Sequence, residues 1–168
     1  VNKISNGGNV SNAWFTLSYD EWYYLLRDRT NAEEKQGVAC VNGINGLVLL
    51  PDNWTLPSGV HFTSGLASNG GYEYYKTVNT YTASEWTLME EAGAVFLPAA
   101  DDRDGTSMNN VGTNGYYWSS TFYSSNYAYS VYFNSGNLFP SYGNFRYRGL
   151  SVRLCSEVVN NNCVVFGT

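Results

Sequence analysis

The segment 119–147, SSTFYSSNYAYSVYFNSGNLFPSYGNFRY, restricts the possible structures of this chain more than any other part. It holds seven Ser, six Tyr, four Asn and four Phe, and Arg146 is its only charged residue. Aromatic residues favour strands, whereas Asn, Gly and Ser favour turns. The composition therefore predicts short strands joined by polar turns. Tyr, Ser and Asn also bind ligands at a low cost in side-chain entropy, as in antibody-type surfaces.

The C-terminal half contains three predicted strands. Residues 115–119 form the first, and residues 129–133 alternate clearly between two faces. The inward face of the second strand is expected to hold Tyr129, Val131 and Phe133, and the outward face Ser130, Tyr132 and Asn134. Residues 148–155 alternate too, with Leu150, Val152 and Leu154 predicted to point inward.

Two helices are predicted from the same start signal, a capping box. In the first, Ser18 precedes Glu21, and apolar residues follow at helical spacing, so we expect a helix from about Tyr19 to Arg29. Thr82 and Glu85 form the second box, and Gly93 is expected to end that helix.

Each helix precedes an apolar strand, at 46–51 and 93–98. Residues 52–81 are predicted to form a long surface excursion, and residues 99–114 a second loop. Early helices and a strand-rich C-terminal half predict an α+β fold with two helices and short, mostly antiparallel strands.

The composition limits the classes of partner. The chain has 168 residues, which predicts one domain, and its net charge is −5. The only basic group near the C-terminus is Arg146, Arg148 and Arg153, so nucleic acid is not an expected partner. No apolar run approaches the length of a membrane-spanning helix.

Neither a metal nor another cofactor is predicted. His61 is the single histidine, and no CxxC motif occurs. Of the three cysteines, Cys155 and Cys163 are close enough in sequence to pair, which would leave Cys40. The acidic residues of the segment 101–104 could suggest calcium, but the run is too short for an EF-hand loop. We interpret it as a solvated turn in which Arg103 compensates the negative charge.

An ordered series of segments resembles a known family. The segments are NGGNVSNAWFTLSYDEWYYLLRDR, NGINGLVLLPDNW, YTASEWTLMEEAGAVFLPAA, GYYWSST, AYSVYF and RGLSVRLC. Together they resemble the Fibrobacter succinogenes major paralogous domain type, found on gut Bacteroidetes surfaces and in their phages. The resemblance implies a C-type-lectin-like fold, of the branch shared with formylglycine-generating enzyme.

The resemblance also implies a domain organisation. A C-type-lectin-like domain would cover residues 1–155, with a C-terminal tail at 156–168. Relatives often carry residues before the position of Ile4, and this chain starts at Val1 with no signal peptide, which suggests either a processed form or a fragment that lacks an N-terminal portion. Relatives usually have Gly where this chain has Asp101.

Some members of the resembled family are targets of diversity-generating retroelements, which turn Asn codons into codons for Tyr, Ser, Phe and similar residues. The composition of 119–147 is similar to such output. The resemblance implies that variable, ligand-binding positions lie between framing residues fixed by structure. The candidate positions are Phe122, Tyr123, Ser125, Asn126, Ser130, Tyr132, Asn134, Asn137, Phe139, Tyr142, Asn144, Phe145 and Tyr147. The framing residues are Trp118, Ala128, Tyr129, Val131, Phe133, Gly149, Val152 and Arg153.

The sequence therefore favours a non-catalytic module, extracellular, on a cell surface or on a phage virion, that binds an unidentified protein or glycan. One alternative is a structural or adhesive tip subunit of a surface or phage fibre. Another is an enzyme similar to formylglycine-generating enzyme. The segment 119–147 contains no His, Cys, Asp or Glu, which argues against acid–base catalysis there.

Overall fold

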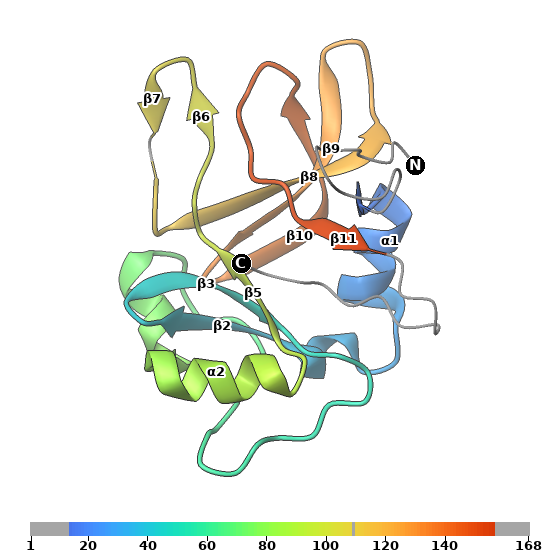
Figure 1. Ribbon diagram of the computed structural model, residues 1–168. Helices are drawn as coiled ribbons and strands as arrows, with labels where there is room; N and C mark the ends of the chain where they lie inside the picture. The colour runs from blue at the N-terminus through green and yellow to red at the C-terminus, as the bar shows by residue number, and fades with distance from the viewer. Residues whose placement is uncertain (1–13, 109, 157–168) are drawn as a thin grey trace, which may run out of the picture.

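The computed structural model describes residues 14–108 and 110–156 (Figure 1). The described chain is a mixed α/β structure with few helices and mostly antiparallel strands in open sheets. The segment before Trp14 and the tail after Ser156, including Cys163, lie outside the described residues, so the predicted tail and its cysteine are not placed.

The central layer is a four-stranded sheet of order β4-β2-β3-β5. Its strands are β2 (Gln36–Val41), β3 (Ile44–Leu49), β4 (Thr80–Tyr81) and β5 (Val95–Pro98). All pairs are antiparallel except β2 with β4. Both faces of β2 and β3 are buried, which explains why the consecutive residues Leu47, Val48 and Leu49 of β3 are all apolar. The strands expected at 46–51 and 93–98 are confirmed and pair with each other through β3 and β5.

The helix α2 (Ala83–Glu91) covers one face of this sheet (Figure 1). Its capping box is formed as predicted, since Glu85 N donates to Thr82 Oγ1 at 3.3 Å and Thr82 N donates to Glu85 Oε2 at 2.7 Å. Trp86 and Met89 pack against the sheet. Gly93 has φ +95°, in the left-handed region that commonly ends helices, so the predicted helix end is confirmed.

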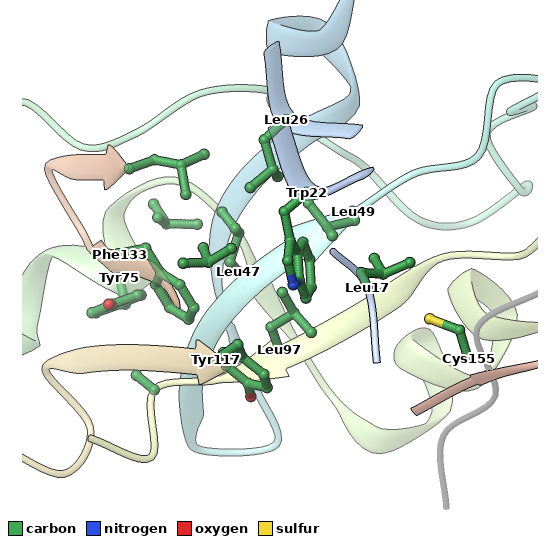
Figure 2. Packing of buried hydrophobic residues seen from close by; sticks show 14 of the residues in the cluster. Leu17, Trp22, Leu26, Leu47, Leu49, Tyr75, Leu97, Tyr117, Phe133 and Cys155 are labelled. Atoms are coloured by element: carbon green, nitrogen blue, oxygen red, sulfur yellow. The ribbon is translucent and has the colours of Figure 1, made fainter. Parts of the chain in front are cut away.

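The first predicted helix is also confirmed but changes its winding. A formed capping box at Ser18 starts α1 (Tyr19–Tyr23), which continues as a wider π-helical turn, η1 (Tyr24–Asp28). Arg29 then adopts an extended conformation. Figure 2 shows that Trp22 points into the main core, among Leu47, Leu49 and Leu97.

The other face of the central sheet meets a three-stranded antiparallel sheet of order β10-β9-β8 through the main core. Its strands are β8 (Asn114–Phe122), β9 (Tyr127–Asn134) and β10 (Asn137–Phe145). Val131 and Phe133 are fully buried and face this core, as the alternation of β9 predicts. Figure 2 shows Phe133 next to Tyr75.

Smaller elements complete the described chain. The strand β1 (Trp14–Thr16) pairs with β11 (Leu154–Ser156), so the two ends of the described chain meet. A hairpin joins β6 (Arg103–Asp104) to β7 (Ser107–Met108). Short 3₁₀ helices occur at η2 (Ala32–Lys35) and η3 (Tyr72–Thr77).

Two expectations about the segments between elements are wrong. Residues 52–81 do not lie wholly on the surface, because Tyr75, Asn79 and Tyr81 are buried. Asn79 Nδ2 donates to the carbonyl oxygens of Val38 and Thr63, so this amide connects the excursion to β2. The alternating pattern of 148–155 also misleads, since Val152 is 49% exposed and the strand begins only at Leu154. Residues 149–151 instead make isolated bridges to Arg103 and Tyr117.

Candidate functional site

The outer face is the side of the β8–β10 sheet that points away from the main core. Cross-strand register and the alternation of side chains define its members. They are Asn114, Tyr116, Trp118, Phe122, Ala128, Ser130, Tyr132, Asn134, Asn137, Phe139, Tyr142 and Asn144. The sheet therefore presents one surface drawn from three strands, and most of these residues fall within the segment 119–147.

Tyr132 lies at the centre of an aromatic group on the outer face. Its ring centroid is 4.8 Å from that of Tyr116, 5.2 Å from that of Tyr142 and 5.9 Å from that of Phe139. The Phe139 and Tyr132 rings are stacked, with an interplanar angle of 8°. Phe139 is 47% and Tyr142 41% exposed, whereas Tyr132 is half-buried. The rings of Phe139 and Tyr142 are therefore exposed to solvent, and they pack against the half-buried ring of Tyr132.

Amide hydrogen bonds fix the neighbouring part of the outer face. Asn134 Nδ2 donates to the Tyr132 hydroxyl at 2.8 Å. Asn134 Oδ1 accepts from Gly136 N at 2.9 Å and from Asn137 Nδ2 at 3.1 Å. These bonds orient the amide and leave the exposed Asn137 at the edge of the aromatic group.

Burial raises the pKa of both Tyr116 and Tyr132 above its ordinary value. Neighbouring tyrosines add to this effect at each hydroxyl, while the hydrogen bond from Asn134 opposes it at Tyr132. Both hydroxyls therefore stay protonated at neutral pH. They can donate and accept hydrogen bonds, which suits recognition rather than proton transfer.

Two predicted site residues do not face solvent. Ser130 is fully buried because it lies in the middle strand between its larger register partners Trp118 and Tyr142, and its hydroxyl donates to the Tyr142 carbonyl at 3.1 Å. Asn144 is 6% exposed, and its Oδ1 accepts a hydrogen bond from Phe145 N at 2.9 Å. The expectation that these two side chains are exposed to solvent is therefore wrong.

The predicted positions do not form one surface. Tyr123, Phe145 and Tyr147 lie in a second aromatic group on the opposite side of the sheet, at the end beyond the core. Ser125 and Asn126 are exposed in the turn between β8 and β9. Phe122 is 65% exposed at the end of β8, with the Arg146 guanidinium 5.9 Å from its ring centroid.

The second aromatic group borders an open cavity of about 550 Å³, named here the tyrosine cleft. It lies between the start of α1 and the end of the β8–β10 sheet. Its lining residues are Tyr19, Tyr123, Tyr127, Tyr129, Ser141 and Gly143. Only Tyr123 among them was predicted as a site residue from the sequence, because the alternation of 129–133 assigned Tyr129 to the core.

Tyr116, on the outer face, was not among the site residues predicted from the sequence. A signal was present, because Tyr116 and Trp118 are two residues apart in a predicted strand and so share a face. The expected strand at 115–119 is confirmed but continues to Phe122, which places Tyr116 well inside it.

The acidic loop differs from its prediction as a solvated turn. Asp101 and Asp102 are 2% and 5% exposed. Asp102 pairs with Arg148 at 2.5 Å, and Asp104 with the same guanidinium at 3.4 Å, so Arg148 supplies the countercharge expected of Arg103. Asp101 has φ +59° and accepts a hydrogen bond from Asn110 N. Within 14–108 and 110–156, no group of three His, Cys, Asp or Glu could hold a metal ion.

Residues 64–155 match the model of a family described as a domain of unknown function (DUF8237). The match covers more than half of the chain, and the chain therefore belongs to this family. No curated protein and no solved structure gives a match. None of the helices in the described part is long and apolar enough to cross a membrane.

Proposed function

We propose that this protein is a non-catalytic recognition module whose outer face binds a protein or glycan ligand. The observation that carries this proposal is the aromatic group around Tyr132, with Phe139 and Tyr142 exposed beside it. Exposed aromatic clusters on a folded domain commonly mark interaction sites. Because the rings stand on a three-stranded sheet and pack on one another, little side-chain entropy is lost when a ligand binds.

The proposed setting is extracellular, on a cell surface or on a phage particle, in a domain with a C-type-lectin-like fold. The order of elements supports this fold, with a capped helix soon after β1 and a closing strand, β11, paired to β1. Asp101 adds support, because its φ of +59° is typical of the glycine that the resembled family has at this position.

A retroelement origin for the outer face is part of the same proposal. Most candidate variable positions are exposed or half-buried, while Val131 and Phe133 between them are fully buried. Surface substitutions usually change stability by within about 0.5 kcal/mol, so such positions tolerate replacement. The source locus should then carry a near-copy of the 3′ coding segment with adenines at the codons of Tyr132, Asn137 and Tyr142. A locus without that copy would contradict the origin but not the binding.

The binding proposal is tested on arrays of extracellular protein domains and oligosaccharides. A double variant, Phe139→Ala with Tyr142→Ala, removes both exposed rings of the aromatic group. We expect it to lose binding to at least one ligand of the native protein while keeping its melting temperature. The control Tyr24→Ala removes a tyrosine that is 56% exposed on η1, away from this face, and should bind normally. Equal binding by the double variant and the control would overturn the proposal.

A further inference from the structure

We propose that the domain has a second binding site, the tyrosine cleft, and that this site takes a neutral sugar residue. The cleft is separate from the outer face because its strand residues, Tyr127 and Tyr129, alternate with Ser130 and Tyr132 along β9. Its volume of about 550 Å³ is in the range of small-molecule sites, about 300–1,000 Å³.

The rings of the cleft are held in place before any ligand binds. Tyr129 lies 4.6 Å from Tyr19 and 4.7 Å from Tyr123, measured between ring centroids. Tyr127 packs 4.4 Å from Phe145 on the far side. Rings from α1 and from the sheet therefore brace one another. Such a wall costs little entropy to use, because each ring has only two side-chain torsions.

The polar groups of the cleft suit an uncharged ligand rich in hydroxyls. None of its lining residues is charged. Within the described chain, the hydroxyls of Tyr19, Tyr123, Tyr127 and Tyr129 make no hydrogen bond, so each can bond to a ligand. A charged ligand would lose hydration without gaining a countercharge. A sugar ring has apolar C–H faces that pack on aromatic rings and hydroxyl edges that hydrogen-bond.

A small residue keeps the cleft open. A Cβ added at Gly143 would lie 3.2 Å from Tyr123 Cε1, which is tighter than usual contact. Gly143 does not have a left-handed φ, so turn geometry does not account for glycine here. Space beside the Tyr123 ring does account for it, which is consistent with a site that must admit a ligand.

A peptide strand is the less favoured occupant. It would have to pair with β10, which is the edge strand beside the cleft. That edge is interrupted by Pro140, which has no N–H, and by a register shift between Phe139 and Tyr142. The Arg27 guanidinium also donates to the Leu138 carbonyl at 2.6 Å and occupies an acceptor of the strand. A sugar needs no free strand edge.

Saturation-transfer NMR with methyl β-galactoside, methyl α-mannoside and methyl β-N-acetylglucosaminide tests this inference on the full chain. N-acetyltyrosinamide serves as the probe for a peptide side chain. We expect at least one glycoside to bind with millimolar affinity. Ser141→Trp places a large ring at an exposed lining position and should weaken that binding by about tenfold or more. Tyr129→Phe keeps the ring but removes a hydroxyl, and a loss of about fivefold is expected.

The matched control is Tyr74→Ala, which removes an exposed tyrosine on η3 outside the cleft and should leave the glycoside signal unchanged. Absence of glycoside binding, or binding that Ser141→Trp leaves intact, overturns the inference. Binding of N-acetyltyrosinamide in place of the glycosides also overturns it. None of these outcomes tests the proposed function, because that function depends on Phe139 and Tyr142. Only the array experiment can overturn it.

Discussion

The ring centroid of Tyr19, at the start of α1, lies 4.6 Å from that of Tyr129 in β9. The next residue of β9, Ser130, points to the opposite side of the sheet. One strand thus supports two aromatic surfaces, the tyrosine cleft and the outer face. The main core continues from Tyr129 along the same side through Val131 and Phe133. The proposed outer-face site and the main core therefore depend on alternate residues of one strand.

Replacing Phe133 with alanine should destabilise the protein far more than replacing Tyr132. Phe133 is fully buried in the main core, so its truncation leaves a cavity and should cost about 3–5 kcal/mol. Tyr132 is half-buried, and its truncation mainly removes ring contacts worth about 1 kcal/mol. Denaturant unfolding measures both values. The reverse order would mean that the face assignment is shifted by one residue.

Gly115 should not accept a side chain while Phe133 is present. A Cβ at Gly115 would overlap the Phe133 ring, so Gly115→Ala forces the core ring to move. We expect a cost of about 1–3 kcal/mol. In a Phe133→Leu background, where the ring is absent, Gly115→Ala should lower the free energy of unfolding by less than it does in the native protein. Gly70→Ala is the control, because its Cβ would meet only the Asn134 side chain at 3.5 Å. Additive effects of the two changes would contradict the steric account.

The ion pair between Asp102 and Arg148 should matter more than the one between Asp104 and Arg148. The Asp102 side chain is 5% exposed and lies 2.5 Å from the guanidinium, whereas Asp104 is 44% exposed at 3.4 Å. Asp102→Ala should lower the free energy of unfolding by about 1.5–3 kcal/mol, and Asp104→Ala by less than about 1 kcal/mol. A double-mutant cycle with Arg148→Ala isolates each pair. Equal coupling energies for the two carboxylates would be inconsistent with this geometry.

Stability should fall at alkaline pH because buried tyrosines resist ionisation. Burial raises the pKa of Tyr75 and Tyr81 well above the ordinary value of about 10. Above that pH the unfolded chain releases these protons while the folded chain keeps them. The free energy of unfolding therefore decreases, by about 1.4 kcal/mol per pH unit for each such group. Below pH 10 this contribution is fully present.

Tyr75→Phe separates this effect from general alkaline damage. The variant loses the hydrogen bond from Tyr75 to the Thr113 carbonyl, about 1 kcal/mol at neutral pH, but it should show a shallower loss of stability above pH 10. Urea unfolding across the alkaline range gives the slope. An unchanged slope would mean that Tyr75 already ionises in the folded protein.

Local signals predicted much of the fold. Both capping boxes placed their helices, because a side-chain oxygen and a Glu three residues later satisfy the first backbone N–H groups wherever the chain lies. The alternation of β9 placed Val131 and Phe133 in the core. The strand β2 was missed, because it follows a polar run and its pairing with β3 depends on contacts distant in sequence.

The candidate site was predicted only in part, for a physical reason. Composition identified the aromatic segment but not how the sheet divides its rings between two sides. Tyr123 and Phe139 were assigned to one surface, whereas the register places them on opposite sides. Burial of Ser130 by larger neighbours likewise arises from cross-strand packing, which no local pattern encodes. The partner of Asp102, Arg148, is distant in the chain, so the adjacent Arg103 was chosen instead.

The central claim is that the outer face is a replaceable recognition surface on an independent scaffold. Its most direct test is a displayed library in which Phe122, Asn137, Phe139 and Tyr142 are randomised, and the fraction of protease-resistant members is measured. The same library is then selected against extracellular proteins and glycans that the native domain does not bind. A control library randomises the buried residues Tyr117, Val131, Phe133 and Leu138. We predict that most outer-face members stay folded and yield new binders, whereas most control members unfold. Equal loss of folding in the two libraries, or a folded outer-face library without new binders, would contradict the claim.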